Sequence, residues 1–260
     1  MPLECARTVR SAGVALLMLL MTPAAGPAAE GERDPFGEGW KAGGFVYVSP
    51  TFEGSRSYQA IAFPFVLPAG VGTDGLVQIK GVDDVRLRLF KADGFELGPL
   101  AGYRFGRDAD DISHVPGLDD VDGGLVVGAF AAYRAGPLAF SVSYHHQATG
   151  DDTGRLLRFG VEHTGRLAPG VKLAAGIGAN YATEDYMTAF FGTGLHAPGA
   201  GFKDVYVEAA ASIDLSDRWS LLLIGRYAHL VGDAADSQIV ETESQFYGGL
   251  ALSYRFDLAR

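Results

Sequence analysis

Apolar and polar residues alternate along most of the chain after residue 40. Near its end, residues 246, 248, 250, 252, 254 and 256 are Phe, Gly, Leu, Leu, Tyr and Phe, and the intervening residues are Tyr, Gly, Ala, Ser and Arg. The segment 171–181 repeats the pattern, with Leu173 and Ile177 on one parity and Lys172 and Asn180 on the other. Successive side chains of a β-strand point to opposite faces, so each segment is predicted to be a strand with one apolar face.

About twelve such segments occur, each close to the roughly ten residues of a tilted transmembrane strand. They start near residues 40, 58, 76, 85, 95, 125, 138, 156, 171, 205, 219 and 245. The predicted fold is therefore all-β, a transmembrane antiparallel up-and-down barrel over residues 40–256, followed by a short tail at 257–260. The soluble alternative is a β-sandwich, which would leave the Gly, Ala and Ser of the second parity on a surface with few charges.

The connections between the segments differ in length in a regular way. The long connections are 106–123, 183–202 and 232–244, with shorter ones at 50–57 and 149–154, and they alternate with the short turns 68–75, 91–94, 135–137, 166–170 and 214–218. Outer-membrane barrels have short periplasmic turns and long outer loops, so the first strand is expected to run outward. Aromatic residues near segment ends are expected to form two interfacial girdles on the lipid face, at Tyr47, Tyr103, Tyr133, Tyr144, Tyr181, Trp219, Tyr227, Tyr254 and Phe256.

The first residues have the order of a secretory signal peptide. Arg7 and Arg10 precede an apolar run at 12–21, and small residues follow at 24–29. A run of this length is too short for a membrane-spanning helix, which needs about 20 residues. We therefore predict a signal peptide at 1–29 and a periplasmic lead-in at 30–39. The single cysteine, Cys5, lies in the predicted signal peptide, so the mature chain is expected to have no disulfide and no acyl anchor.

Composition agrees with a β protein that does not bind nucleic acid. The chain has 36 Gly, 16 Phe and 11 Tyr, with 20% charged residues and a mean hydropathy of +0.11. Turn-forming and aromatic residues favour strands over helices. The formal net charge of −10 disfavours binding to phosphate backbones, which requires clustered Lys and Arg.

Five segments, in this order and at these spacings, carry a resemblance to a known family. They are GGFVYVSPTFEGSRSY at 43–58, GPLAGYRFGR at 98–107, DYMTAFFG at 185–192, GDAADSQIV at 232–240 and GGLALSYRF at 248–256. The chain resembles the MltA-interacting protein family, MipA/OmpV, of Gram-negative outer-membrane barrels. Phe190 and Thr193 depart from the family's usual Tyr and Val, and residues 257–260 follow the terminal aromatic Phe256.

The resemblance implies a protein exported through the periplasm to the outer membrane, in contact with lipid and lipopolysaccharide. It implies a non-catalytic scaffold that brings a murein lytic transglycosylase together with a penicillin-binding protein, with no cofactor. Other members of the family are described as adhesins or as contributors to antibiotic permeability. A surface adhesin, or a narrow pore for small anionic solutes or antibiotics, is therefore the alternative function.

Charged residues on the second parity are the candidate lumen-facing charges. Two interpretations stay open: a salt-bridge network that fills a narrow barrel, which we prefer, or a basic ladder that selects anions. A barrel of about twelve strands lies between filled eight-stranded barrels and open porins. The candidates are Arg86, Arg88, Arg104, Arg134, Arg158, Glu162, Lys172, Glu208, Arg226 and Arg255.

The long connection 183–202 carries four large apolar side chains, Tyr186, Met187, Phe190 and Phe191. Burial of each would contribute about 1.5–3 kcal/mol, so they are not expected to stand free in water. We predict that residues 186–191 fold back into the outer mouth of the barrel as a plug. The alternative is an aromatic cluster on the outer rim.

Neither a catalytic residue nor a metal site is predicted. Ser143 and His145 would share one side of a strand and His146 the other, but the sequence places no carboxylate or oxyanion donor beside them. Unchanged activity after removal of the His pair would exclude a lipid hydrolase. The acidic residues of 106–123 lack the spacing of a calcium loop, and we expect a solvated anionic loop; they are Asp108, Asp110, Asp111, Asp119, Asp120 and Asp122.

Overall fold

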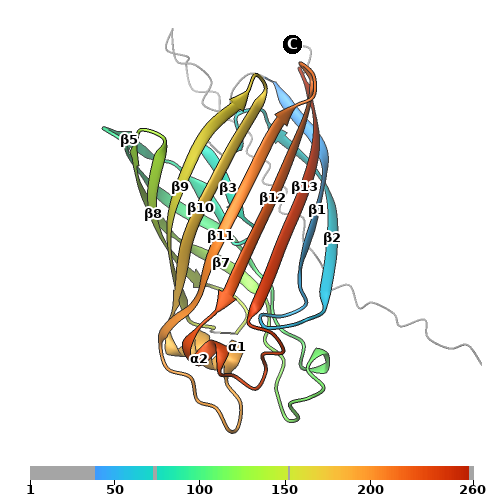
Figure 1. Ribbon diagram of the computed structural model, residues 1–260, viewed down its shortest axis with the longest axis vertical. Coiled ribbons are helices and arrows are strands. Elements are labelled where there is room, and N and C mark those ends of the chain that lie inside the picture. The colour runs from blue at the N-terminus through green and yellow to red at the C-terminus, as the bar shows by residue number, and fades with distance from the viewer. Residues whose placement is uncertain (1–38, 73–74, 152, 258–260) are drawn as a thin grey trace, which may run out of the picture. The chain divides into compact units, whose positions relative to one another are not determined.

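The computed structural model describes residues 39–72, 75–151 and 153–257. These residues form one antiparallel sheet of thirteen strands, with three short helices in the connections (Figure 1). The predicted signal peptide and nearly all of the predicted lead-in lie outside the described residues. The first strand begins at Trp40 and the last ends at Phe256.

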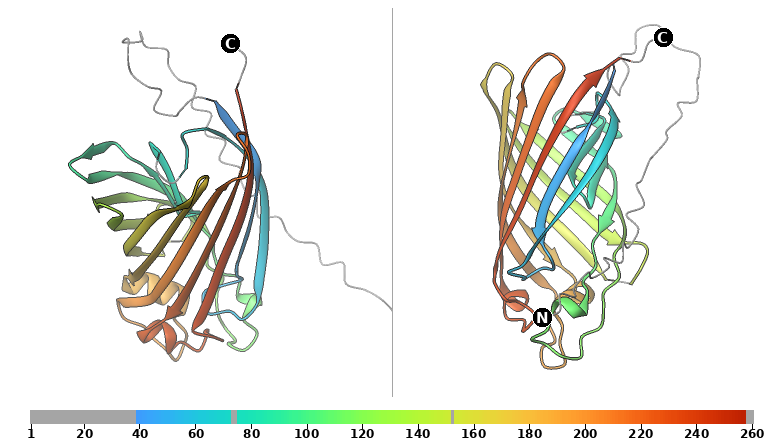
Figure 2. Two further views of the ribbon diagram at one scale, coloured as in Figure 1. Left: turned by 45° about the horizontal axis from the view of Figure 1, so that its top comes forward. Right: turned by 90° about the vertical axis from the view of Figure 1, so that its right-hand side faces the viewer.

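The strands follow one another as a meander around a curled sheet (Figure 2). In chain order they are β1 (Trp40–Pro50), β2 (Tyr58–Pro68), β3 (Val77–Gly81), β4 (Asp84–Leu87), β5 (Phe90–Ala92), β6 (Phe95–Arg104), β7 (Gly124–Ala135), β8 (Leu138–Gln147), β9 (Arg155–Ala168), β10 (Val171–Ala182), β11 (Gly201–Asp214), β12 (Trp219–Leu230) and β13 (Ser244–Phe256). Most are hydrogen-bonded to their chain neighbours, β4 and β5 both pair with β6, and the first strand also pairs with the last, whereas β2 and β3 end the pairing order. The meander confirms the predicted up-and-down barrel class.

The predicted fourth strand is present as two pieces, β4 and β5, which pair one after the other along β6. Their pairing stops between Leu97 and Leu100 of β6. Pro99 lies in this interval and has no N–H to donate, while its register with Ala129 of β7 is intact. The missing donor therefore faces the β4–β5 side and breaks that strand, so the thirteen strands occupy the twelve predicted positions.

The sheet has an apolar outer face and a polar inner face. In β10, Leu173 and Ile177 are exposed on the outer face, whereas Asn180 is buried on the inner one. Ring pairs mark the short-turn end of the outer face, with centroids 5.1 Å apart for Trp219 and Tyr254. This is the alternation of a barrel whose outer face contacts lipid.

Tyr47 is a correction to the predicted aromatic girdle. Val46 and Val48 are exposed on the outer face of β1, so Tyr47 lies between them on the inner face. The prediction was wrong because β1 is apolar on both parities, with Phe45 and Tyr47 inside and the two valines outside. Alternation alone cannot orient such a strand.

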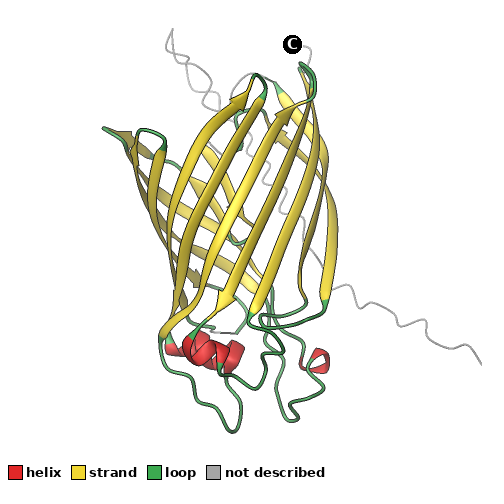
Figure 3. Ribbon diagram, viewed as in Figure 1, coloured by secondary structure: helices red, strands yellow, loops and turns green. Residues whose placement is uncertain are grey.

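The helices lie together at one end of the sheet, with the long loops, and the short turns lie at the other end (Figure 3). They are the 3-10 helix η1 (Ala109–Asp111), α1 (Glu184–Phe191) and α2 (Gly232–Ala235). None of the helices among the described residues is long and apolar enough to cross a membrane. The largest buried apolar cluster surrounds α1, so the core of the molecule lies at the mouth with the long loops.

A charge at Ile177 should impair membrane assembly far more than one on the inner face. Ile177 is 61% exposed on the outer face, where an Arg near the middle of a bilayer costs about 2–4 kcal/mol. We expect Ile177→Arg to lose most of the folded, heat-modifiable band on gels. Ala174→Arg, on the inner face of the same strand, is the control.

Gly178, the adjacent inner-face position, is not a suitable control because a side chain there would collide with the Tyr206 ring. Equal amounts of folded band for the Ile177 and Ala174 variants would mean that the two faces are assigned the wrong way round.

Candidate functional site

The charged side chains predicted for the lumen all belong to the inner parity of their strands. Arg86 and Arg104 are buried, while Lys172 and Arg255 are exposed at the short-turn ends of β10 and β13. The other six are partly buried: Arg88, Arg134, Arg158, Glu162, Glu208 and Arg226.

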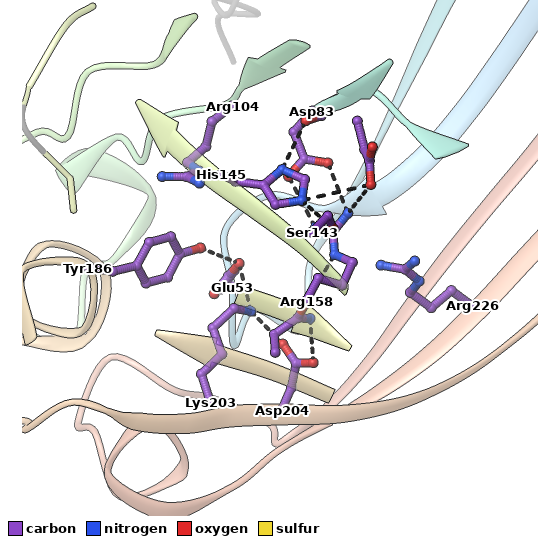
Figure 4. Close-up of polar contacts among 12 residues, drawn as sticks. Glu53, Asp83, Arg104, Ser143, His145, Arg158, Tyr186, Lys203, Asp204 and Arg226 are labelled. Atoms are coloured by element: carbon purple, nitrogen blue, oxygen red, sulfur yellow. Dashed lines mark hydrogen bonds and ion pairs between the residues drawn. The ribbon is translucent and has the colours of Figure 1, made fainter. Parts of the chain in front are cut away.

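Two neighbouring carboxylates at the tip of the β3–β4 hairpin organise the inner face. An Asp83 oxygen lies 3.1 Å from Nη2 of Arg158 on β9 (Figure 4). An Asp84 oxygen lies 2.7 Å from Nε of Arg86 on β4. Asp84 is completely buried and also lies 3.5 Å from Arg158. Buried charges are tolerated only when paired, so Arg86 neutralises Asp84 within β4 while Arg158 holds the hairpin tip against β9.

Ser143 and His145 contact this same tip. The Ser143 hydroxyl lies 2.9 Å from Nε2 of His145, and Nδ1 of His145 faces the carbonyl oxygen of Asp83 at 3.2 Å. The sequence did not place a carboxylate beside this pair, because Asp83 comes about sixty residues earlier in the chain. Ser143 is only 2% exposed and also contacts Arg86, so no substrate can approach it without displacing the hairpin.

The next residue, His146, lies on the other face of β8. It is partly buried at the end of β8, on the parity of the exposed Tyr144. The two imidazoles therefore do not act on a common group.

The network continues from Arg158 toward the mouth with the long loops. Arg158 Nε donates to Asn180 Oδ1 at 3.1 Å, and Asn180 Nδ2 donates to Asp204 Oδ1 at 2.7 Å. Lys203 lies between Asp204 and Glu53, the latter at 3.1 Å. One polar chain thus connects β9, β10 and β11 with the β1–β2 loop (Figure 4).

The final member of this chain is Tyr186 of α1, whose hydroxyl donates to Glu53 at 2.9 Å. Burial and the nearby Glu53 carboxylate raise the pKa of Tyr186, so the phenol stays protonated as the donor. The Arg104 guanidinium lies over the same ring, 4.9 Å from its centroid. α1 is therefore attached to the inner face by its first turn.

The four apolar residues of the predicted plug are all buried in α1. Tyr186, Met187, Phe190 and Phe191 pack with residues of the adjacent strand ends and of α2. Their spacing along the chain puts them on one side of a helix, which the sequence had suggested only as a loop that folds back. The surrounding residues are Val121, Leu156, Ala182, Leu230 and Ala234.

Further ion pairs occupy other parts of the inner face. Glu162 lies 3.1 Å from Lys80 of β3, and Glu208 lies 2.6 Å from Arg226. Arg88 lies 3.4 Å from Glu96. Among the described residues, no carboxylate lies within ion-pair distance of Arg134, Lys172 or Arg255, all near the short-turn end.

The acidic loop is held by its own backbone. Asp108 accepts a hydrogen bond from the Asp110 N–H at 3.0 Å, and Asp120 accepts one from the Ala109 N–H at 2.8 Å. Burial, together with Asp108 and Asp110, raises the pKa of Asp111. Within the described ranges, no group of three His, Cys, Asp or Glu side chains is placed to hold a metal ion.

Removal of Arg158 should destabilise the folded barrel strongly. In Arg158→Met, Asp83 and the buried Asp84 lose a shared cation, which costs about 3–5 kcal/mol for a buried pair. We expect a lower midpoint of guanidinium unfolding in detergent, followed by tryptophan fluorescence. Lys172→Met, at an inner-face cation without such a partner, should leave the midpoint unchanged. Equal midpoints for the two variants would show that the Arg158 pairs do not stabilise the fold.

Comparison with known proteins places the chain in a family. The family model described as MltA-interacting protein MipA matches residues 42–256. Outer membrane protein OmpV of Vibrio cholerae is 26% identical over 173 residues, which cover 60% of this chain and 64% of that protein. Omp26La of Vibrio anguillarum is 25% identical over 172 residues, with the same coverage. The match thus spans less than two thirds of the length of these relatives.

Solved structures of outer-membrane channels are also similar to the chain. The COG4313 channel of Pseudomonas putida F1 has a TM-score of 0.45 at 12% identity, covering 88% of this chain and 100% of that one. The channel DcaP of Acinetobacter baumannii has a TM-score of 0.39 at 9% identity, covering 84% and 96%. With the family match over nearly the whole sheet, the chain belongs to the MltA-interacting protein MipA family of outer-membrane β-barrel proteins.

Proposed function

We propose that this protein is a non-catalytic scaffold that links a murein lytic transglycosylase and a penicillin-binding protein to the outer membrane. The observation that carries the proposal is the filled mouth of the barrel, where α1 and the Arg158–Glu53 chain of contacts occupy the inner face. A barrel filled in this way acts through its surfaces. The family description, which names an MltA partner, supports a murein transglycosylase as that partner.

The burial of Ser143 and His145 supports the non-catalytic part of the proposal. Ser143 and His145 are both buried and committed to the β3–β4 hairpin. Among the residues that the structure describes, no second Ser–His pair is hydrogen-bonded. The pair therefore positions a hairpin.

The turn between β11 and β12 offers a docking point for a periplasmic partner. It carries a shallow hollow of about 290 Å³ lined by Ser216, Asp217, Arg218, Trp219 and Tyr254. Arg218 donates to the Tyr254 hydroxyl at 3.0 Å, which holds the guanidinium beside two aromatic rings. Arg, Trp and Tyr are the residues most often found at the energetic centre of protein interfaces.

The scaffold proposal is tested by co-purification from detergent extracts of cells. Tagged wild-type barrel should retain the transglycosylase, and Arg218→Glu should retain much less. Arg166→Glu, a charge reversal at an exposed residue near the short-turn end of β9, should retain the wild-type amount. A wild-type barrel that retains no murein enzyme would overturn the proposal, whereas equal retention by both variants would move the docking point to another turn.

A second candidate function, a gated narrow pore, is supported by unsatisfied polar groups at the mouth. Arg104 Nη2, both Nε and Nη1 of Arg107, and Glu53 Oε2 are buried without a hydrogen-bond partner among the described residues. Each such group costs about 1–3 kcal/mol, a cost that hydration would relieve. The unsatisfied groups therefore offset part of the free energy that the apolar contacts of α1 contribute to the closed mouth.

Deletion of residues 186–191 should leave the barrel folded and raise its conductance. The deletion removes the side chains that fill the mouth and exposes Arg104 and Glu53 to water. Single-channel recordings in planar bilayers and uptake of small antibiotics measure the change. Leu195→Ala, at an 86% exposed position of the same loop, is the control and should behave as wild type. A folded deletion variant with wild-type conductance and uptake would exclude the plug.

A further inference from the structure

β2, like the neighbouring part of β1, is apolar on both faces. Its outer face carries Ala60, Ala62, Pro64 and Val66, and its inner face carries four large apolar residues. All of these inner residues remain partly exposed on the inner face. They are Ile61, Phe63, Phe65 and Leu67.

The neighbouring strands extend this inner apolar surface and are shaped to fit it. Phe45 of β1 packs edge-on against Phe63, with ring centroids 5.3 Å apart. A side chain at Gly249 of β13 would lie 2.7 Å from the Phe45 ring, and one at Gly43 would lie 2.8 Å from the Phe65 ring. The two glycines thus let the aromatic rings lie flat on the sheet.

This apolar surface lies at an edge of the sheet. β2 and β3 are the two terminal strands in the pairing order. On β3, the preceding loop bonds to backbone groups of the edge. The Gly72 N–H donates to the Val77 carbonyl oxygen, and the Gly72 carbonyl oxygen accepts from the Ile79 N–H. That edge has hydrogen-bond partners without β2.

On β2, proline interrupts the free edge. The Thr51 N–H donates to the Ser57 carbonyl oxygen, and the Ala69 N–H donates to the Gly39 carbonyl oxygen. The odd-numbered residues of this segment therefore direct their backbone groups toward β1, and the even-numbered residues direct theirs toward the free edge. Pro64 therefore lacks its N–H on the free side, in the middle of the edge, where a continuous ladder with another strand cannot form. Both edges therefore disfavour hydrogen bonding between β2 and β3, and the seam between these two strands stays open beside the bilayer.

Cations lie at the short-turn end of the same surface. Lys41 is in register with Leu67 on β2 and with Arg255 on β13. Like charges directly opposite in a sheet are destabilising, and no described carboxylate lies within ion-pair distance of either. An anionic group between them would relieve the repulsion.

We propose that this surface binds a long-chain fatty acid, which enters from the bilayer through the seam between β2 and β3. Its chain lies on Phe45, Phe63 and Phe65, and its carboxylate lies between Lys41 and Arg255. The surface from residue 61 to residue 67 is about 20 Å long, close to an extended sixteen-carbon chain. Its apolar width of two strands fits one chain. The site is independent of the scaffold function.

Binding of radiolabelled hexadecanoate to the purified barrel, in nanodiscs, tests the charge requirement. Wild type should bind one equivalent, and Lys41→Gln combined with Arg255→Gln should weaken binding by about tenfold. Arg134→Gln, a cation at the same end of β7, is the matched control. Hexadecanol should bind wild type and the double variant alike. Equal hexadecanoate affinity for all three proteins would overturn the proposed carboxylate site.

A tryptophan reporter tests the location of the chain. In a Trp40→Phe, Trp219→Phe background, Phe65→Trp should be quenched by dibromostearate and recover when hexadecanoate is added. Phe130→Trp, on the inner face of β7 away from the seam, should not be quenched. A folded Phe65→Trp barrel that shows no quenching, or quenching of both reporters that hexadecanoate does not reverse, would overturn the proposal.

Discussion

The fold of the inner face depends on the two adjacent carboxylates of the β3–β4 tip. Asp83 and Asp84 draw Arg158 and Arg86 toward one point, and Arg158 in turn orders Asn180 and the residues beyond it. A pair of buried carboxylates without these cations would repel each other and require solvent. The hairpin therefore lies on the inner face because its carboxylates find their cation, Arg158, there.

This constraint extends from the hairpin tip to the mouth of the barrel. The contacts that start at the hairpin tip end at Tyr186, so the seating of α1 depends on residues of β9, β10 and β11. The short-turn end has fewer such contacts, and Arg134, Lys172 and Arg255 have no described carboxylate within ion-pair distance there. The inner face therefore has one filled end, at the mouth, and one end where several cations stay unpaired by described carboxylates.

The strands could be predicted from the sequence because a period of two is visible wherever one face is polar. Lys172 and Asn180 orient β10 without any structural information. The burial of the four apolar residues of α1 was predicted on a different ground, because large apolar side chains in a loop gain free energy when they leave water. The prediction was wrong for Tyr47, where both parities are apolar. The carboxylate beside His145 could not be predicted either, since its proximity arises from three-dimensional pairing between distant strands.

The pairing order also fixes when the sheet can be completed. β1 pairs along its length with β13, the most distant strand in the chain, while the chain neighbours β2 and β3 remain the free edges. The entropic cost of closing a loop grows with its length, and contacts between distant residues form slowly. β1 is therefore paired on one side only, with β2, until β13 is present. A chain that lacks β13 exposes two further strand edges, those of β1 and β12, so the correct assembly of this protein depends on the arrival of its carboxyl-terminal strand.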